Sequence, residues 1–122
     1  MKIKIDKVVD HGTLNSERVQ ISVLQDVELG DFIVADTTYT ISTRVSNKLR
    51  HMHWFNDQRV KAGDKVELYT KSGTNSKVDI GSGNTKYTIH WGLNKCVWNN
   101  EGDAAVLFYA PTWNATKVNE AD

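Results

Sequence analysis

Apolar and polar residues alternate strictly in the segment Arg18-Val19-Gln20-Ile21-Ser22-Val23, and this alternation indicates the fold class. Successive side chains of a β-strand point to opposite faces, so a period of two predicts a strand with one buried and one solvated face. The same alternation recurs in residues 3–8, 65–68 and 87–91. The sequence therefore predicts a chain built mainly from half-buried strands.

The remaining segments complete an all-β pattern. Residues 104–109 are apolar at both parities, which predicts an inner strand covered on both sides. Residues 71–76 and 81–84 are polar and rich in Gly, Ser and Asn, which predicts loops. Residues 44–60 fit helical and strand spacing about equally well. We predict a β-sandwich of about seven to nine short, mainly antiparallel strands.

Composition describes one domain and excludes several classes of protein. The 122 residues carry 15 Lys and Arg against 15 Asp and Glu, so the formal net charge is zero. This balance argues against a general polyanion-binding protein. The single cysteine, Cys96, excludes an internal disulfide and a cysteine-based zinc finger, and we expect it to serve in packing.

Targeting signals are missing from the given sequence. Residues 1–6 alternate between charged and apolar side chains and contain no apolar core of a signal peptide. No window approaches the roughly 18 apolar residues of a membrane span. We therefore expect a cytoplasmic protein without membrane insertion; secretion stays open if a leader has been trimmed away.

Two stretches carry a family resemblance. Met52-His53-Trp54-Phe55 leads through a turn into residues 57–69, which contain an Ala-Gly bend at Ala62-Gly63 and then an alternating strand. Residues 97–107 place Trp98 and a Gly-containing turn before a strand of apolar residues. In this order the motifs resemble the lamin tail domain family, and residues 3–21 are similar to its first two strands.

The resemblance covers roughly residues 2–118 and implies an immunoglobulin-like β-sandwich. It implies a single domain over residues 1–118 with a polar tail at 119–122, and a strand at 49–55. Independently of the resemblance, residues 99–103 are rich in oxygen ligands but lack the alternating Asp spacing of a calcium loop, so a structural turn is favoured over a cation site. The chain lacks a coiled-coil rod, a basic import run and a prenylation motif. It is therefore closer to bacterial stand-alone or accessory modules of the family than to a lamin.

A cluster of basic residues predicts a binding surface. Between residues 44 and 65 only two residues are acidic, whereas residues 26–36 contain four acidic residues and no Lys or Arg. We expect a basic face, carrying Trp54, that contacts a protein or nucleic acid. The alternative is that these charges only keep sheet edges soluble. The predicted contact residues are Arg44, Lys48, Arg50, Trp54, Arg59, Lys61 and Lys65.

Two other kinds of site stay open. Trp91 and Trp98 flank a turn and are expected in the core, whereas Trp54 and Trp113 are the better candidates for an exposed platform that binds carbohydrate. His51 and His53 share one face if residues 49–55 form a strand, and they could hold a metal only with a third ligand.

Catalytic patterns are missing, and we expect a binding module rather than an enzyme. No serine lies in a Gly-x-Ser-x-Gly elbow, and no motif marks Cys96 as an activated thiolate. We expect no cofactor, and a monomer or a weak homodimer. The leading hypothesis is a non-enzymatic interaction module of the lamin tail type.

Overall fold

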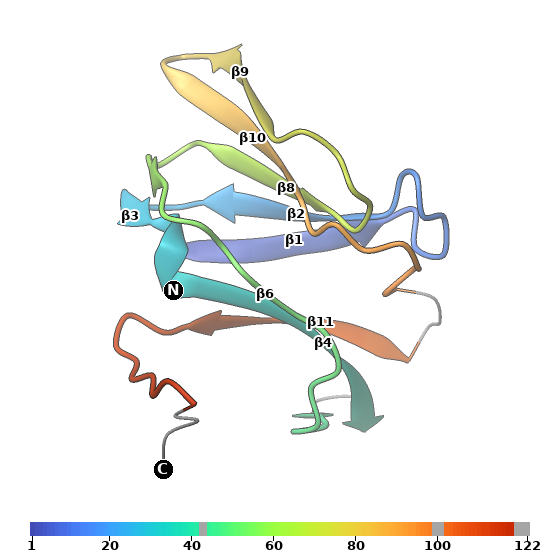
Figure 1. Ribbon diagram of the computed structural model, residues 1–122. Helices are drawn as coiled ribbons and strands as arrows, with labels where there is room; N and C mark the ends of the chain where they lie inside the picture. Colours follow the sequence, from blue (N-terminus) through green and yellow to red (C-terminus); the bar gives the residue numbers. More distant parts are fainter. Residues whose placement is uncertain (42–43, 99–101, 119–122) are drawn as a thin grey trace.

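The computed structural model describes residues 1–41, 44–98 and 102–118, in which two β-sheets pack against each other (Figure 1). The side chains of residues 39–41 and 44 lie outside that description, as do the predicted tail at 119–122 and most of the turn at 99–103. The predicted all-β sandwich is confirmed. Seven described strands have five or more residues, and four segments of two or three residues bring the total to eleven.

The first sheet has five strands in the order β1-β2-β8-β10-β9. Its neighbours are antiparallel except for β8 and β10, which run parallel. Its members are β1 (Ile3–Val9), β2 (Arg18–Val23), β8 (Lys65–Tyr69), β9 (Ser76–Gly81) and β10 (Asn84–His90).

The second sheet is centred on the longest strand, β4, which pairs with β11 on one side and with β5 and β6 on the other. A separate pair, β3 with β7, lies before β4, and the three-residue 3-10 helix η1 (Leu29–Asp31) connects β3 to β4. No helix in the described ranges is long and apolar enough to cross a membrane. The strands are β3 (Val27–Glu28), β4 (Phe32–Ile41), β5 (Arg44–Val45), β6 (Met52–Trp54), β7 (Arg59–Val60) and β11 (Asp103–Tyr109).

The core lies between the sheets and contains the predicted inward positions. Val19, Ile21 and Val23 of β2 are all buried, as the alternation predicted. From the second sheet, Phe32 and Val34 complete the same cluster. The buried apolar residues contact one another across the sandwich, which is the main source of stability for a domain of this size.

The predicted turn at residues 62–64 leads into β8 and is hydrogen-bonded to the start of β10. Gly63 has a φ of 93°, a left-handed angle that glycine adopts without strain. The Asp64 carboxylate accepts hydrogen bonds from Lys61 N at 2.8 Å, Thr85 N at 2.9 Å and Asn84 Nδ2 at 3.0 Å. Burial by itself would raise the pKa of Asp64. These hydrogen bonds lower the pKa by more than burial raises it, so the net shift is downward.

The structure differs from the sequence-based prediction at three places. Residues 104–109 were expected to form an inner strand, but β11 is the outer strand of its sheet in the described part of the chain. Residues 76–81 form strand β9, which was not expected and whose six residues are all exposed. The strand expected at 49–55 is confirmed only for β6, and no helix forms in residues 44–60.

Candidate ligand-binding site

Two exposed tryptophans meet at the end of β6. Trp54 lies opposite Ile33 of β4, and its Nε1 donates to Gly30 O at 2.7 Å, which fixes the indole at the start of the sheet. Trp113, from the segment after β11, contacts Trp54 with ring centroids 4.9 Å apart and ring planes at 88°. Trp54 is 46% exposed and Trp113 is 62% exposed. The two rings form an open aromatic corner.

Polar groups line a hollow beside the aromatic corner. The hollow has a volume of about 460 Å³ and is bounded by Trp54, Trp113, Asp31, Asn56 and Asp57, among others. Asp57 is packed so closely against η1 that a Cβ at Gly30 would lie 2.2 Å from its Oδ1 atom. Carboxylate oxygens accept hydrogen bonds and an amide both donates and accepts, so this set can bind neighbouring hydroxyl groups.

A second hollow lies on the other side of Asn56 and Asp57, next to β9 and β10. Asn56 and Asp57 line both hollows, so the aromatic corner and this cleft share one wall. The cleft has a volume of about 410 Å³ and is otherwise lined by β9, β10, the loop before β9, Gln58 and His53. The two hollows, which share the wall at Asn56 and Asp57, are together named the ligand groove.

His53 connects the cleft to the core. Its ring contacts Phe55 at 4.9 Å and Trp91 at 5.8 Å, and Trp91 in turn contacts Trp98 at 6.2 Å. Burial lowers the pKa of His53, because a buried imidazolium loses hydration. Within the described residues its buried Nε2 atom has no hydrogen-bond partner. Burial therefore favours the neutral form of His53 beside the cleft.

The predicted basic residues fall into two groups at opposite ends of β4. Lys48 and Arg50 lie beside Thr37 and Thr38, near the end of this strand. Arg59 lies opposite Glu28 of β3, before the strand begins. Six residues of extended strand span about 20 Å, so β4 alone separates the groups by that distance. Figure 1 shows the loop before β6 and strand β3 at these two ends.

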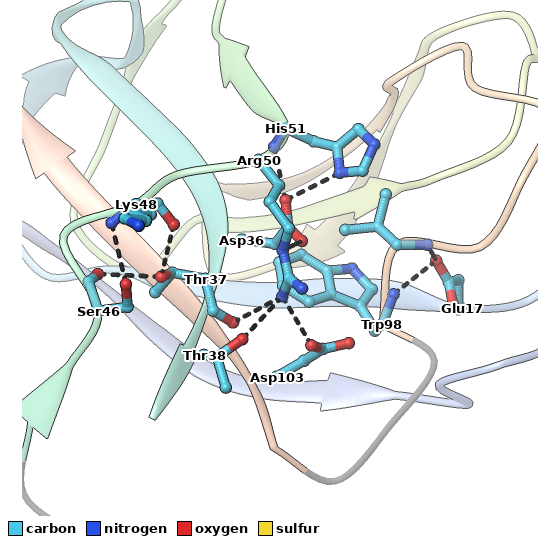
Figure 2. Close-up of polar contacts among 11 residues, drawn as sticks. Glu17, Asp36, Thr37, Thr38, Ser46, Lys48, Arg50, His51, Trp98 and Asp103 are labelled. Atoms are coloured by element: carbon cyan, nitrogen blue, oxygen red, sulfur yellow. Dashed lines mark hydrogen bonds and ion pairs between the residues drawn. The ribbon is translucent and has the colours of Figure 1, made fainter. Parts of the chain in front are cut away.

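Arg50 is engaged with buried carboxylates rather than presented freely to a partner. Its Nε lies 3.2 Å from Asp36 Oδ2, and its guanidinium also donates to Asp103 Oδ1 at 2.8 Å (Figure 2). The Asp36 and Asp103 side chains are 2% and 4% exposed. Removing Arg50 would take the cation away from two buried carboxylates, which is costly, so Arg50 has a structural role.

The other predicted cations have varied surroundings. Lys61 Nζ donates to Gly83 O at 2.7 Å, and Lys65 Nζ donates to Ser22 Oγ at 2.9 Å. Lys48 and Arg59 are exposed, and the side chain of Arg44 lies outside the described residues. Two of the acidic residues in segment 26–36 also have structural contacts: Asp26 accepts from Ala62 N, and Glu28 accepts from Gly30 N and Gln58 N.

The two histidines of the proposed metal pair have different neighbours. His51 donates from its backbone N and interacts through Nδ1 with Asp36 Oδ1, at 2.6 and 2.9 Å (Figure 2). His53 instead contacts aromatic rings. No group of three His, Cys, Asp or Glu side chains that could hold a metal is found among the residues described.

A buried acid that the sequence did not single out fixes the loop before β11. Glu17 is fully buried, and its Oε2 atom accepts from Thr70 Oγ1 at 2.5 Å, Val97 N at 2.8 Å and Trp98 N at 3.4 Å. Figure 2 shows Glu17 beside this loop. Burial and the nearby Glu17 carboxylate raise the pKa of the Cys96 thiol, which agrees with a packing role for Cys96.

Sequence reasoning found the aromatic half of the groove and missed the polar half. Trp54 and Trp113 were the candidates for exposure, and both are exposed; Trp98 is buried and Trp91 half-buried, as expected of core anchors. Asn56 and Asp57 gave no sequence signal beyond their position just after Trp54. Polar residues of a loop are surface residues by default, so only the fold reveals the hollow they line.

Comparisons of the chain with protein-family models, with curated proteins and with solved structures find no match. The resemblance to the lamin tail domain therefore stays a prediction, based on the order of the sequence motifs.

Proposed function

We propose that this protein is a non-catalytic carbohydrate-binding module, with the groove beside Trp54 and Trp113 as its ligand site. The observation that carries the proposal is the aromatic corner itself: two exposed indoles in contact, with Asp31, Asn56 and Asp57 beside them. An indole offers a large, rigid apolar face at low entropic cost, and the carboxylates and amide supply directional hydrogen bonds.

The chemistry of a sugar ring matches this arrangement. One face of a pyranose carries C–H groups that pack on an aromatic ring, while its hydroxyl groups point outward to polar side chains. The perpendicular rings would hold one sugar face on one indole, with the second indole as a side wall. Asn56 and Asp57 also line the neighbouring cleft, so an oligosaccharide could extend from the corner toward His53.

The sequence-based hypothesis of a basic contact face competes with this proposal. The predicted cations lie in two groups, and Arg50, Lys61 and Lys65 already have partners in the fold. The two hypotheses differ in their response to salt, because the attraction of exposed cations to an anionic partner is screened, whereas stacking is not.

A glycan panel tests the proposal. We expect at least one neutral oligosaccharide series to shift the tryptophan fluorescence and to give a calorimetric binding signal that persists at high salt. Trp54→Ala and Trp113→Ala should each weaken binding about tenfold or more, because loss of one stacking contact corresponds to about 1.4 kcal/mol or more.

The matched control is Met52→Ala. Met52 is also exposed and on the same strand, but it does not line the hollow, so its replacement should leave binding unchanged. Charge reversal at Arg59 should also have no effect. Saccharide binding that is equally strong in both tryptophan variants would contradict the proposal. Binding of DNA or an acidic protein that disappears with salt and with Arg59 reversal would support the basic face instead.

A further inference from the structure

Along the outer edge of β11, Ala105, Leu107 and Tyr109 have no strand partner among the residues described. In the described part of the chain, β4 is the only strand paired with β11. Ala110 N donates to Asp31 O at 2.7 Å, which fixes the parity of the ladder. Backbone groups of Val106 and Phe108 therefore point toward β4, and those of Ala105, Leu107 and Tyr109 point away from it.

Strand β11 lacks the lysines that the outer strands of the first sheet carry. Charged side chains, above all Lys, commonly prevent an exposed edge strand from pairing with another chain. The outer strands of the first sheet follow this rule: β1 carries Lys4 and Lys7, and β9 carries Lys77. Strand β11 has the sequence Asp-Ala-Ala-Val-Leu-Phe-Tyr and contains no Lys or Arg.

In the described part of the C-terminal segment, the contacts of Ala110 and Trp113 are with η1 and β6 rather than with the outer edge of β11. After Tyr109 the chain turns toward η1, where Ala110 contacts Asp31, and Trp113 then packs on Trp54. Trp54 belongs to β6, which lies on the opposite side of β4 from β11. Phe108 and Tyr109, at the end of β11, are 36% and 50% exposed.

We propose that a second copy of this chain pairs with the edge, with the two β11 strands antiparallel about Val106. In this register Ala105 of each copy lies opposite Leu107 of the other, and both have backbone groups that point outward. These pairs form four hydrogen bonds between the copies. The proposal is independent of the carbohydrate-binding function.

The side chains of β11 are complementary to themselves in this register. Each large residue lies opposite a small one: Leu107 opposite Ala105, and Phe108 opposite Ala104. Val106 lies opposite its own copy. Cross-strand pairs of this kind fill the sheet surface without steric conflict. The one charged residue, Asp103, is at the start of the strand, so the two copies of Asp103 lie at opposite ends of the pair, about 20 Å apart.

The pairing would create a continuous sheet with the aromatic corners of both copies on one side. The twofold axis runs perpendicular to the sheet, so the faces that carry Trp54 in the two copies point in the same direction. Between the two β6 strands there are five strand spacings of about 4.8 Å each, or about 24 Å in total. A polymeric ligand could then bind both grooves at once.

Sedimentation or light scattering over a concentration series tests the pairing. A small edge-to-edge interface is expected to be of the weak class, so the series should cover about 5 to about 500 μM. The mean mass of the wild-type chain should increase from 13.8 kDa toward twice that value. Val106→Lys should stay monomeric, because it places two ammonium groups opposite each other at the axis.

Charge-matched variants separate this effect from unfolding or altered solubility. Val78→Lys makes the same change on β9, where Val78 is 53% exposed, and should associate as the wild type does. A mixture of Val106→Lys with Val106→Glu should restore association, because opposite charges then face each other. A wild-type chain that is monomeric at every concentration would overturn the proposal, as would a Val106→Lys variant that dimerises normally.

Discussion

Glu17 provides the most direct test of how the loop before β11 is held. Its carboxylate accepts four hydrogen bonds from groups far apart in the sequence, from Gly12 N at Oε1 and from Thr70, Val97 and Trp98 at Oε2. Replacement by Ala would leave the three buried donors at Oε2, from Thr70, Val97 and Trp98, without this acceptor, whereas Gly12 is exposed and can be hydrated. The anchored loop carries Trp98, which supports Trp91 and through it His53 at the cleft.

The expected loss can be estimated from these contacts. One buried donor left without a partner costs about 1–3 kcal/mol, and water entering the site reduces the sum for several donors. We expect Glu17→Ala to lower the free energy of unfolding by about 3–4 kcal/mol, near the upper end for single substitutions. For 122 residues the entropy of unfolding is about 0.26 kcal/mol/K, so Tm should decrease by about 12–16 °C.

Glu17→Gln should give an intermediate result. The amide keeps one acceptor oxygen for the Oε2 partners but directs an NH₂ group at Gly12 N, which is itself a donor. We expect a loss of about 1–2 kcal/mol. Asp26→Ala is the matched control, because Asp26 is an exposed acid that accepts one backbone hydrogen bond, from Ala62 N.

Urea unfolding followed by tryptophan fluorescence measures all three variants. Thiol labelling gives a second readout: the Glu17 carboxylate contributes to the raised pKa of Cys96, so Glu17→Ala should speed labelling at mildly alkaline pH. If Glu17→Ala unfolded at the same urea concentration as Asp26→Ala, Glu17 would not be the anchor that its contacts indicate.

Three further predictions concern the cleft, the aromatic corner and the turn before β8. Burial lowers the pKa of His53 from its ordinary 6.5, so the folded state binds this proton less readily than the unfolded chain. Stability should therefore be full above about pH 6.5 and decrease below it, and Tm measured against pH should decrease less in His53→Gln. Gly30→Ala places a Cβ 2.2 Å from Asp57 Oδ1 and should weaken saccharide binding in calorimetry at least as much as a conservative change at Asp57 itself. The pKa of Asp64 is lowered, so its contribution to stability is present above about pH 4 and is lost as the pH falls further; Asp64→Asn should lower Tm at neutral pH and flatten this acid limb, and an unchanged limb would contradict the assignment.

Strand positions were predictable because alternation is a local property of the sequence. The apolar residues of β1, β2 and β8 recur at every second position, and a chain with this pattern buries them only as strands with one inward face. Strand β9 was not predicted, although Val78 and Ile80 also alternate with charged residues. Both of its faces are exposed, and it is held by pairing with β10.

The neighbours of a strand, by contrast, depend on contacts that no local pattern encodes. Residues 104–109 are apolar at both parities, which is typical of an inner strand, yet β11 lies at an edge. On one face Leu107 packs against the core, while Phe108 on the other face is partly exposed. An apolar run is thus compatible with a buried inner strand or with an apolar strand at a sheet edge. Only the arrangement of the sheets distinguishes these two cases.

The alternation of side chains was enough to predict an all-β sandwich, and the sequence also predicted a core around Trp98, with Trp54 and Trp113 as the exposed tryptophans. The tertiary structure decided that these two rings meet, that Asn56 and Asp57 border them, and that Arg50 is bound to Asp36 and Asp103. The physical reason is the range of the forces involved. Side-chain alternation acts between neighbours in the chain, whereas a site is made where packing brings distant segments together.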